Sequence, residues 1–173
     1  SARVATRASD TTWSAACAQQ LLARYGVVTR EVTQAEAVSG GFSVVYDVFK
    51  SMEERGRVRR GYFTAGVGAM QFAMPAALDL LRSLRADPEE PQAVMLASTD
   101  PANPYGAILK WPRPDVPLAG NGRGPSRSAG TSVVIVNGRL GAFVSRGARQ
   151  VTSYLPGDEP DRSLVGCHVA EQL

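Results

Sequence analysis

The amino-acid sequence predicts an α+β fold, in which a winged helix-turn-helix is followed by a small antiparallel β-barrel or curled sheet. Between residues 25 and 74, two helical patterns and then two strand patterns follow one another around glycine-containing turns. After an acidic, proline-containing stretch at residues 87–91, strand patterns predominate. We therefore expect two domains: a winged-helix domain with flanking helices at residues 1–86, and a barrel-like domain with a terminal helix at residues 92–173.

The first helix is expected to follow Asp10, whose carboxylate can cap it. Apolar residues recur at helical spacing behind this cap, and Gly26 is a favourable residue for the end of the helix. A shorter helix is expected at residues 30–37. Thr29 can cap this helix, and Glu31 lies in its first turn, where the helix dipole favours a carboxylate.

The third helical pattern begins after the break at Gly40-Gly41 and ends before Gly56. Its apolar residues form one stripe: Phe42, Val45, Phe49 and Met52. Its other face carries the polar residues Ser43, Asp47, Lys50 and Glu54. Two helices joined by a short glycine-containing turn, the second of them amphipathic, are typical of a helix-turn-helix.

A basic segment begins the predicted wing. Residues 57–63 alternate apolar and polar side chains as a strand does, and they include three arginines. Residues 64–69 contain two glycines suited to a hairpin loop, and residues 70–74 are expected to return as a second strand. Together with the two preceding helices, this hairpin completes the pattern of a winged helix.

The winged helix is followed by one more predicted helix. Pro75 favours a helix start, and the helix is expected to continue to about Arg85. We expect Leu78, Leu81 and Leu84 on its buried face. The acidic stretch that follows is the predicted domain boundary.

In the second domain, strands are expected over residues 93–97, 107–111, 131–136, 139–145 and 150–155. The first of these is entirely apolar, so we expect it to be buried. Asn137-Gly138, between two apolar runs, is the strongest hairpin signal of the chain. Residues 112–130 offer little to bury and are expected to form a long exposed loop, and residues 161–173 are expected to form a helix.

Composition narrows the partners and the sites. Residues 1–85 contain 11 basic and 7 acidic side chains, against 8 and 9 in the remainder, so the first half is the better partner for a polyanion. No apolar run is long enough to span a membrane, and the first residues lack the apolar core of a secretory signal; we expect a cytoplasmic protein. Two cysteines and one histidine are too few for a four-ligand zinc site, and no metal is expected.

The second helix of the predicted helix-turn-helix and the base of the wing hold the candidate nucleic-acid-binding residues, since these elements face a groove and its phosphates in winged helices. They are Ser39, Gly40, Gly41, Ser43, Tyr46, Lys50, Arg57, Arg59 and Arg60. Amides at the helix start favour an anion, and arginines near phosphates add affinity. The alternative is packing against a neighbouring domain, because Asp47, Glu53 and Glu54 would repel phosphate. Tyr46 is expected to be partly buried beside Phe42.

The loop of residues 99–106 is the other unusual stretch. Asp100, with Asn103 and Tyr105 nearby, is a candidate catalytic residue that could activate a water in hydrolysis. The favoured alternative is that Asp100 and Asn103 hydrogen-bond the backbone of a proline-rich turn. Phosphate-binding and nucleophile-elbow motifs are absent, so the chain is not expected to hydrolyse ATP by itself.

Four segments resemble, nearly in order, the C-terminal region of the large helicase-related (Lhr) proteins: ARYGVVTRE, SGGFSVVYDVFKSMEERGRVRRGYF, GAMQFAMP and ASTDPANPYGAILKWP. These are bacterial superfamily 2 ATP-dependent DNA helicases of the DEAD/DEAH-box kind, and the resemblance extends from about Trp13 to Pro112. It implies that the motor, with ATP and Mg²⁺, lies in an N-terminal core outside this chain, which would hold no cofactor itself. It also implies three kinds of partner: single-stranded or forked DNA, that helicase core, and further copies of the chain in a homo-oligomer.

Three functions are compatible with this resemblance. The first is a non-motor accessory module of a DNA repair helicase that binds nucleic acid, supports oligomerisation, or both. The second is a uracil-DNA base-excision domain, and the third is a structural packing platform. The layout is also similar to winged-helix glycosylases that unhook DNA crosslinks, but their Gln-x-Gln motif is missing, since Gln71 is followed by Phe72 and Ala73.

Overall fold

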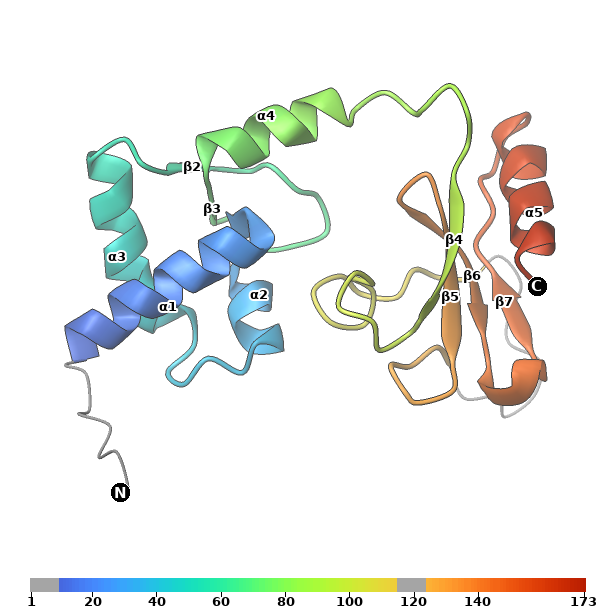
Figure 1. The fold of residues 1–173 in the computed structure, drawn as a ribbon, viewed down its shortest axis with the longest axis horizontal. Coiled ribbons are helices and arrows are strands. Elements are labelled where there is room, and N and C mark those ends of the chain that lie inside the picture. The colour runs from blue at the N-terminus through green and yellow to red at the C-terminus, as the bar shows by residue number, and fades with distance from the viewer. Residues whose placement is uncertain (1–9, 115–123) are drawn as a thin grey trace, which may run out of the picture. The chain divides into compact units, whose positions relative to one another are not determined.

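A computed structural model describes residues 10–114 and 124–173. The chain divides into two compact units, Ser1–Arg85 and Ala86–Leu173. Figure 1 shows the helices α1 to α4 in the first unit and the four-stranded sheet with α5 in the second. Each unit is described by itself.

The helices of the first unit lie where the sequence predicts them. They are α1 (Asp10–Tyr25), α2 (Arg30–Ala35), α3 (Phe42–Glu54) and α4 (Pro75–Ser83). The hydroxyl of Thr29 accepts a hydrogen bond from the Val32 amide at 3.4 Å, as expected for a cap. α2 is two residues shorter than predicted, because the chain turns away at Ala37, where φ is 49°.

A small antiparallel sheet completes the winged helix. Its strands are β1 (Val27–Val28), β2 (Arg59–Gly61) and β3 (Gln71–Ala73), in the order β1-β3-β2. Phe72 of β3 lies opposite Val28 of β1 and opposite Arg60 of β2. The two predicted wing strands are confirmed in shorter form, whereas β1 was not predicted.

The core of the first unit is built around the apolar stripe of α3. Val45 and Phe49 are fully buried, and the Phe49 ring stacks on that of Phe72 with 5.2 Å between centroids. Leu21 and Leu22 of α1 are also buried. The predicted amphipathic stripe of this helix is therefore confirmed.

The prediction of a buried leucine face on α4 is wrong beyond its first turns. Leu78 is 6% exposed, but Leu81 is 39% and Leu84 is 68% exposed. The first turn packs closely, since a Cβ on Gly26 would lie 2.8 Å from the Cβ of Ala77. The strands beneath the helix have only two or three residues each, so they cannot cover its second half.

The second unit is a four-stranded antiparallel sheet with one helix. Its strands are β4 (Ala93–Ala97), β5 (Ser132–Val136), β6 (Arg139–Val144) and β7 (Val151–Ser153), in sequence order, with the 3₁₀ turn η1 (Arg146–Ala148) before β7. α5 (Asp161–Glu171) buries Val165 and Val169 against β5 and β6. The predicted hairpin is confirmed, with positive φ at both Asn137 and Gly138, as a tight two-residue turn requires.

Two strand predictions in this unit need correction. Residues 107–111 form no strand; the amides of Ile108 and Leu109 both donate to the Pro104 carbonyl in a compact turn. β4 exists but is not buried, with Val94 46% and Met95 37% exposed. It lies at an edge of the sheet, so in the described part of the chain it has a neighbour on one side only.

The predicted barrel is not confirmed. Over the described residues the four strands form an open sheet, with β4 and β7 at its edges. Part of the predicted long loop, residues 115–123, lies outside the described residues. Within residues 10–114 and 124–173, no helix is both long and apolar enough to cross a membrane.

Candidate nucleic-acid interface

The N-terminal end of α3 begins with a glycine turn that the fold requires. Gly40 has a φ of 79°, and a Cβ there would lie 2.3 Å from Cγ2 of Val44. The Gly41 amide donates to the Val38 carbonyl at 2.8 Å, and the Ser43 hydroxyl donates to the Gly40 carbonyl at 2.8 Å. Both donors are therefore used within the turn, and an anion would have to compete with these hydrogen bonds.

The polar face of α3 is exposed along its whole length, as predicted. Ser43, Asp47, Lys50 and Glu54 are all exposed. Tyr46 is half-buried, with its ring centroid 6.2 Å from that of Phe42 and 6.1 Å from that of Phe72. One side of the Tyr46 ring thus belongs to the core.

The arginines at the wing base form a basic collar, defined as Arg57, Arg59 and Arg60. All three are exposed, and Nε of Arg60 lies 3.3 Å from Oε1 of Glu53. Among the described residues, no carboxylate pairs with Arg57 or Arg59. Residues 50–60 hold five basic side chains against two acidic ones, so their net charge is +3.

The structure separates the two groups of predicted binding residues. The glycine turn lies at the start of α3 and the basic collar follows its end. α3 has 13 residues, so its ends lie roughly 20 Å apart at about 1.5 Å of rise per residue. A ligand that contacts both groups must therefore extend along the helix.

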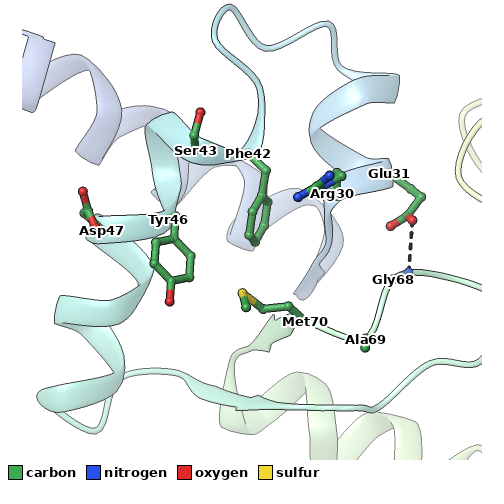
Figure 2. A pocket seen from close by; sticks show the side chains of 9 residues that line it. All are labelled: Arg30, Glu31, Phe42, Ser43, Tyr46, Asp47, Gly68, Ala69 and Met70. Atoms are coloured by element: carbon green, nitrogen blue, oxygen red, sulfur yellow. Dashed lines mark hydrogen bonds between the residues drawn. The ribbon is translucent and has the colours of Figure 1, made fainter.

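A pocket that sequence reasoning missed lies at the first of these ends. Its volume is about 750 Å³. It lies between the start of α2, the first turns of α3 and the loop that precedes β3 (Figure 2). It is lined by Arg30, Glu31, Phe42, Ser43, Tyr46, Asp47, Gly68, Ala69 and Met70. We name it the wing pocket. No local sequence pattern predicts it, because it forms where Gly68 of the loop contacts Glu31 of α2, 37 positions earlier in the sequence.

Glu31 lies at the end of the wing pocket away from Tyr46 and Asp47 (Figure 2). Its Oε1 accepts a hydrogen bond from the Gly68 amide at 3.0 Å. Its Oε2 is buried and has no hydrogen-bond partner among the described residues. Burial acts to raise the pKa of this carboxyl, but Thr29, the backbone amides of Glu31 and Gly68, and the charge of Arg30 together lower it below its ordinary value.

Gln71 holds the loop in this place. Its side chain is fully buried, and its Oε1 accepts hydrogen bonds from the amides of Phe63 at 2.9 Å and Thr64 at 2.8 Å. Its Nε2 donates to the carbonyls of Thr64 at 2.8 Å and Gly68 at 3.0 Å. Gln71 therefore ties both ends of the wing loop together and positions Gly68 beside Glu31.

The loop around Asp100 has the turn structure that the sequence favoured. Oδ1 of Asp100 accepts a hydrogen bond from the Ala102 amide at 2.8 Å. Asn103 is 1% exposed, and its side chain donates to the Ser98 carbonyl at 2.8 Å and accepts from the Tyr105 amide at 3.1 Å. Asp100 and Asn103 thus stabilise the turn, and a catalytic role for Asp100 stays a prediction.

Arg127 fastens the same loop from a distant part of the sequence. Its guanidinium donates to four backbone carbonyls, those of Thr99, Asp100, Asn103 and Tyr105, at 2.6–3.3 Å. Gly106 passes close to Trp111, because a Cβ there would lie 2.5 Å from Nε1 of the indole. In the described ranges no group of three or more His, Cys, Asp or Glu side chains could hold a metal ion.

Comparison with known proteins places the chain in a family. The model of the winged-helix domain of the large helicase-related protein matches residues 7–93. The chain is 43% identical over 153 residues to "Lhr helicase/ probable uracil glycosylase" of Mycolicibacterium smegmatis, and 34% identical over 154 residues to "Lhr helicase/uracil glycosylase" of Escherichia coli. These alignments cover 86% and 87% of this chain but 10% of each relative. This chain belongs to the Lhr family of helicase-related proteins.

Proposed function

We propose that this chain is a nucleic-acid-binding accessory module of an Lhr-family helicase. It binds single-stranded or forked DNA along α3 and the basic collar, while ATP and Mg²⁺ act in a helicase core elsewhere in the polypeptide. The observation that carries this proposal is the pair of exposed arginines, Arg57 and Arg59, for which the described residues supply no carboxylate. Phosphates of a DNA backbone are the natural counter-charge for such a pair.

The basic collar predicts how binding depends on salt. Each phosphate that an arginine neutralises releases counterions, so affinity falls as salt rises with a slope set by the number of contacts, about 0.7 per phosphate on a single strand. Replacing Arg57 and Arg59 with Glu is expected to weaken binding and to lower that slope by about 1.4. Arg82→Glu on α4 is the matched control, because Arg82 is exposed and pairs only with exposed Asp79 among the described residues.

Fluorescence polarisation with labelled single-stranded and forked oligonucleotides across a salt series tests the proposal. The expected result is a large loss for the double variant and little change for Arg82→Glu. Equal slopes in the wild type and the double variant would remove the basic collar from the interface. No binding at low salt would refute the function itself.

A second candidate is a packing role within the larger protein. Leu80 of α4 and Leu84, which caps its C-terminal end, are 59% and 68% exposed and lie four residues apart, so they form one apolar face. The aligned segments make up 10% of each relative, and we infer that another domain of the same polypeptide covers this face. Leu80→Lys/Leu84→Lys should then leave the isolated chain stable but make the full-length protein more sensitive to protease. If light scattering instead shows that the isolated wild-type chain dimerises and the variant does not, a second copy is the occupant.

A third candidate is uracil excision, which the printed names of both relatives include. If the chain excises uracil, Asp100 would activate the attacking water near a base that is flipped out of the DNA duplex. Incubation with uracil-containing DNA, followed by alkaline cleavage, measures the activity directly. Equal product from wild type and Asp100→Asn would exclude Asp100 as the catalytic group, and absence of product would exclude the activity for this chain.

A further inference from the structure

The walls of the wing pocket are suited to a flat aromatic ligand. Tyr46 and Phe42 present their rings, and the thioether of Met70 lies between them and the loop (Figure 2). Met70 is 44% exposed, so this apolar surface is open to solvent. The volume of about 750 Å³ falls in the usual range of small-ligand sites, about 300–1,000 Å³. Aromatic side chains of this kind stack with unpaired bases in single-strand-binding proteins.

The polar end of the pocket selects for hydrogen-bond donors. Oε2 of Glu31 has no hydrogen-bond partner among the described residues, so it has the capacity to accept another hydrogen bond. The lowered pKa keeps Glu31 ionised at neutral pH, and an ionised carboxylate only accepts hydrogen bonds. A ligand that satisfies Oε2 must therefore present an N–H or O–H group.

We propose that the wing pocket binds one unpaired nucleobase that carries an exocyclic amino group, with this group donating to Oε2 of Glu31. Cytosine, adenine and guanine have such a group. Thymine and uracil present one N–H between two carbonyl oxygens, and those oxygens would face the carboxylate unfavourably. A cationic peptide side chain would also donate to Glu31, but Arg30 lines the same pocket and would repel it.

This inference rests on the proposed DNA-binding function. A single strand whose phosphates lie on the basic collar reaches the wing pocket by following α3 over roughly 20 Å. Ser43 and Asp47 are exposed residues of α3 that also line the pocket, so the pocket borders the exposed face of the helix. The collar would supply affinity for any strand, and the pocket would supply a preference among bases.

The test compares labelled oligo(dC) and oligo(dT) of equal length by fluorescence polarisation at neutral pH and low salt. A hydrogen bond to a charged group is worth about 1.5–3 kcal/mol, so the wild-type chain is expected to bind oligo(dC) at least about tenfold more tightly. Glu31→Gln replaces the acceptor by an amide that also donates, and it should bring the ratio of oligo(dC) to oligo(dT) affinity close to one. Glu54→Gln makes the same chemical change on the exposed face and should keep the preference.

The fluorescence of a base analogue provides a second measurement. Oligo(dT) with one central 2-aminopurine, which carries an exocyclic amino group, should change its fluorescence on binding to the wild type and much less on binding to Glu31→Gln. Equal wild-type affinity for oligo(dC) and oligo(dT) would overturn the inference and leave the proposed function standing. Absence of binding to either would refute the proposed function as well. The comparison of oligo(dC) with oligo(dT) on the wild-type chain tests the inference even if Glu31→Gln is unstable.

Discussion

Gln71→Leu removes the side chain on which the wing loop depends. Gln71 is fully buried and makes four hydrogen bonds, to the backbone of Phe63, Thr64 and Gly68. Leucine has a similar size but can replace none of these bonds. The perturbation therefore separates the hydrogen bonds of Gln71 from its packing.

The structure gives the expected size of the effect. Four hydrogen bonds at about 0.5–1.5 kcal/mol each amount to about 2–6 kcal/mol. The loop is partly exposed, so water can reach some of its freed groups, and we expect a loss of about 2–3 kcal/mol in the free energy of unfolding. For a domain of 60–100 residues this corresponds to a Tm lowered by roughly 10–20 °C.

Thermal unfolding followed by far-UV circular dichroism measures this loss, since α1 to α4 lie in the first unit and dominate the helical signal. Gln34→Leu is the control, because Gln34 is an exposed residue of α2 and such surface changes usually stay within about 0.5 kcal/mol. If Gln71→Leu and Gln34→Leu had the same Tm, the wing loop would not depend on Gln71.

Three further changes follow from the same structure. Gly40→Ala should destabilise the first unit by about 1–3 kcal/mol in thermal unfolding, because φ is positive there and the added Cβ would meet Val44. Arg127→Ala should accelerate amide hydrogen exchange in the loop at Asn103, since the guanidinium no longer holds its carbonyls. The pKa of Glu31 in the folded protein is lowered from its ordinary value of 4.5, so the ionised carboxylate stabilises the fold at higher pH. This contribution is lost as the pH falls below 4.5 and through the folded-state pKa. In Glu31→Gln the free energy of unfolding should therefore fall less steeply with acid than in the wild type.

The elements that could be predicted have local signals. Gly26 directly follows the last residue of α1, as predicted, and Thr29 caps α2 through its own side chain. Asn137-Gly138 adopts the positive φ values that its hairpin turn requires. In each case the residues that determine the conformation are within a few positions of the element that they start or end.

The errors arose where the fold depends on distant residues. Residues 107–111 have the composition of a strand. In the structure the amides of Ile108 and Leu109 donate to the Pro104 carbonyl in a turn, and Trp111 packs on Phe143. Leu84 has the spacing of a core residue, yet the short sheet beneath α4 ends before it. Periodicity reports which residues share a face and not whether another element covers that face.

In the candidate site too, one part could be predicted from the sequence and the other could not. The basic collar could be identified from composition, because arginines at a wing base are exposed whatever the details of packing. The wing pocket could not, because it exists only when Gln71 holds the loop and Gly68 meets Glu31. A buried glutamine in a short strand looks unremarkable in sequence, although its hydrogen bonds determine the shape of the pocket.

The two ends of α3 therefore make different contributions that one set of variants can separate. In the proposed complex the basic collar acts through charge, so changes to Arg57 and Arg59 should alter the salt slope equally for every oligonucleotide. The wing pocket acts through one buried acceptor, so a change to Glu31 should alter the ratio of affinities between bases and leave the slope as it is. If the salt slope and the base preference changed together in every variant, the two ends would not act as separate sites.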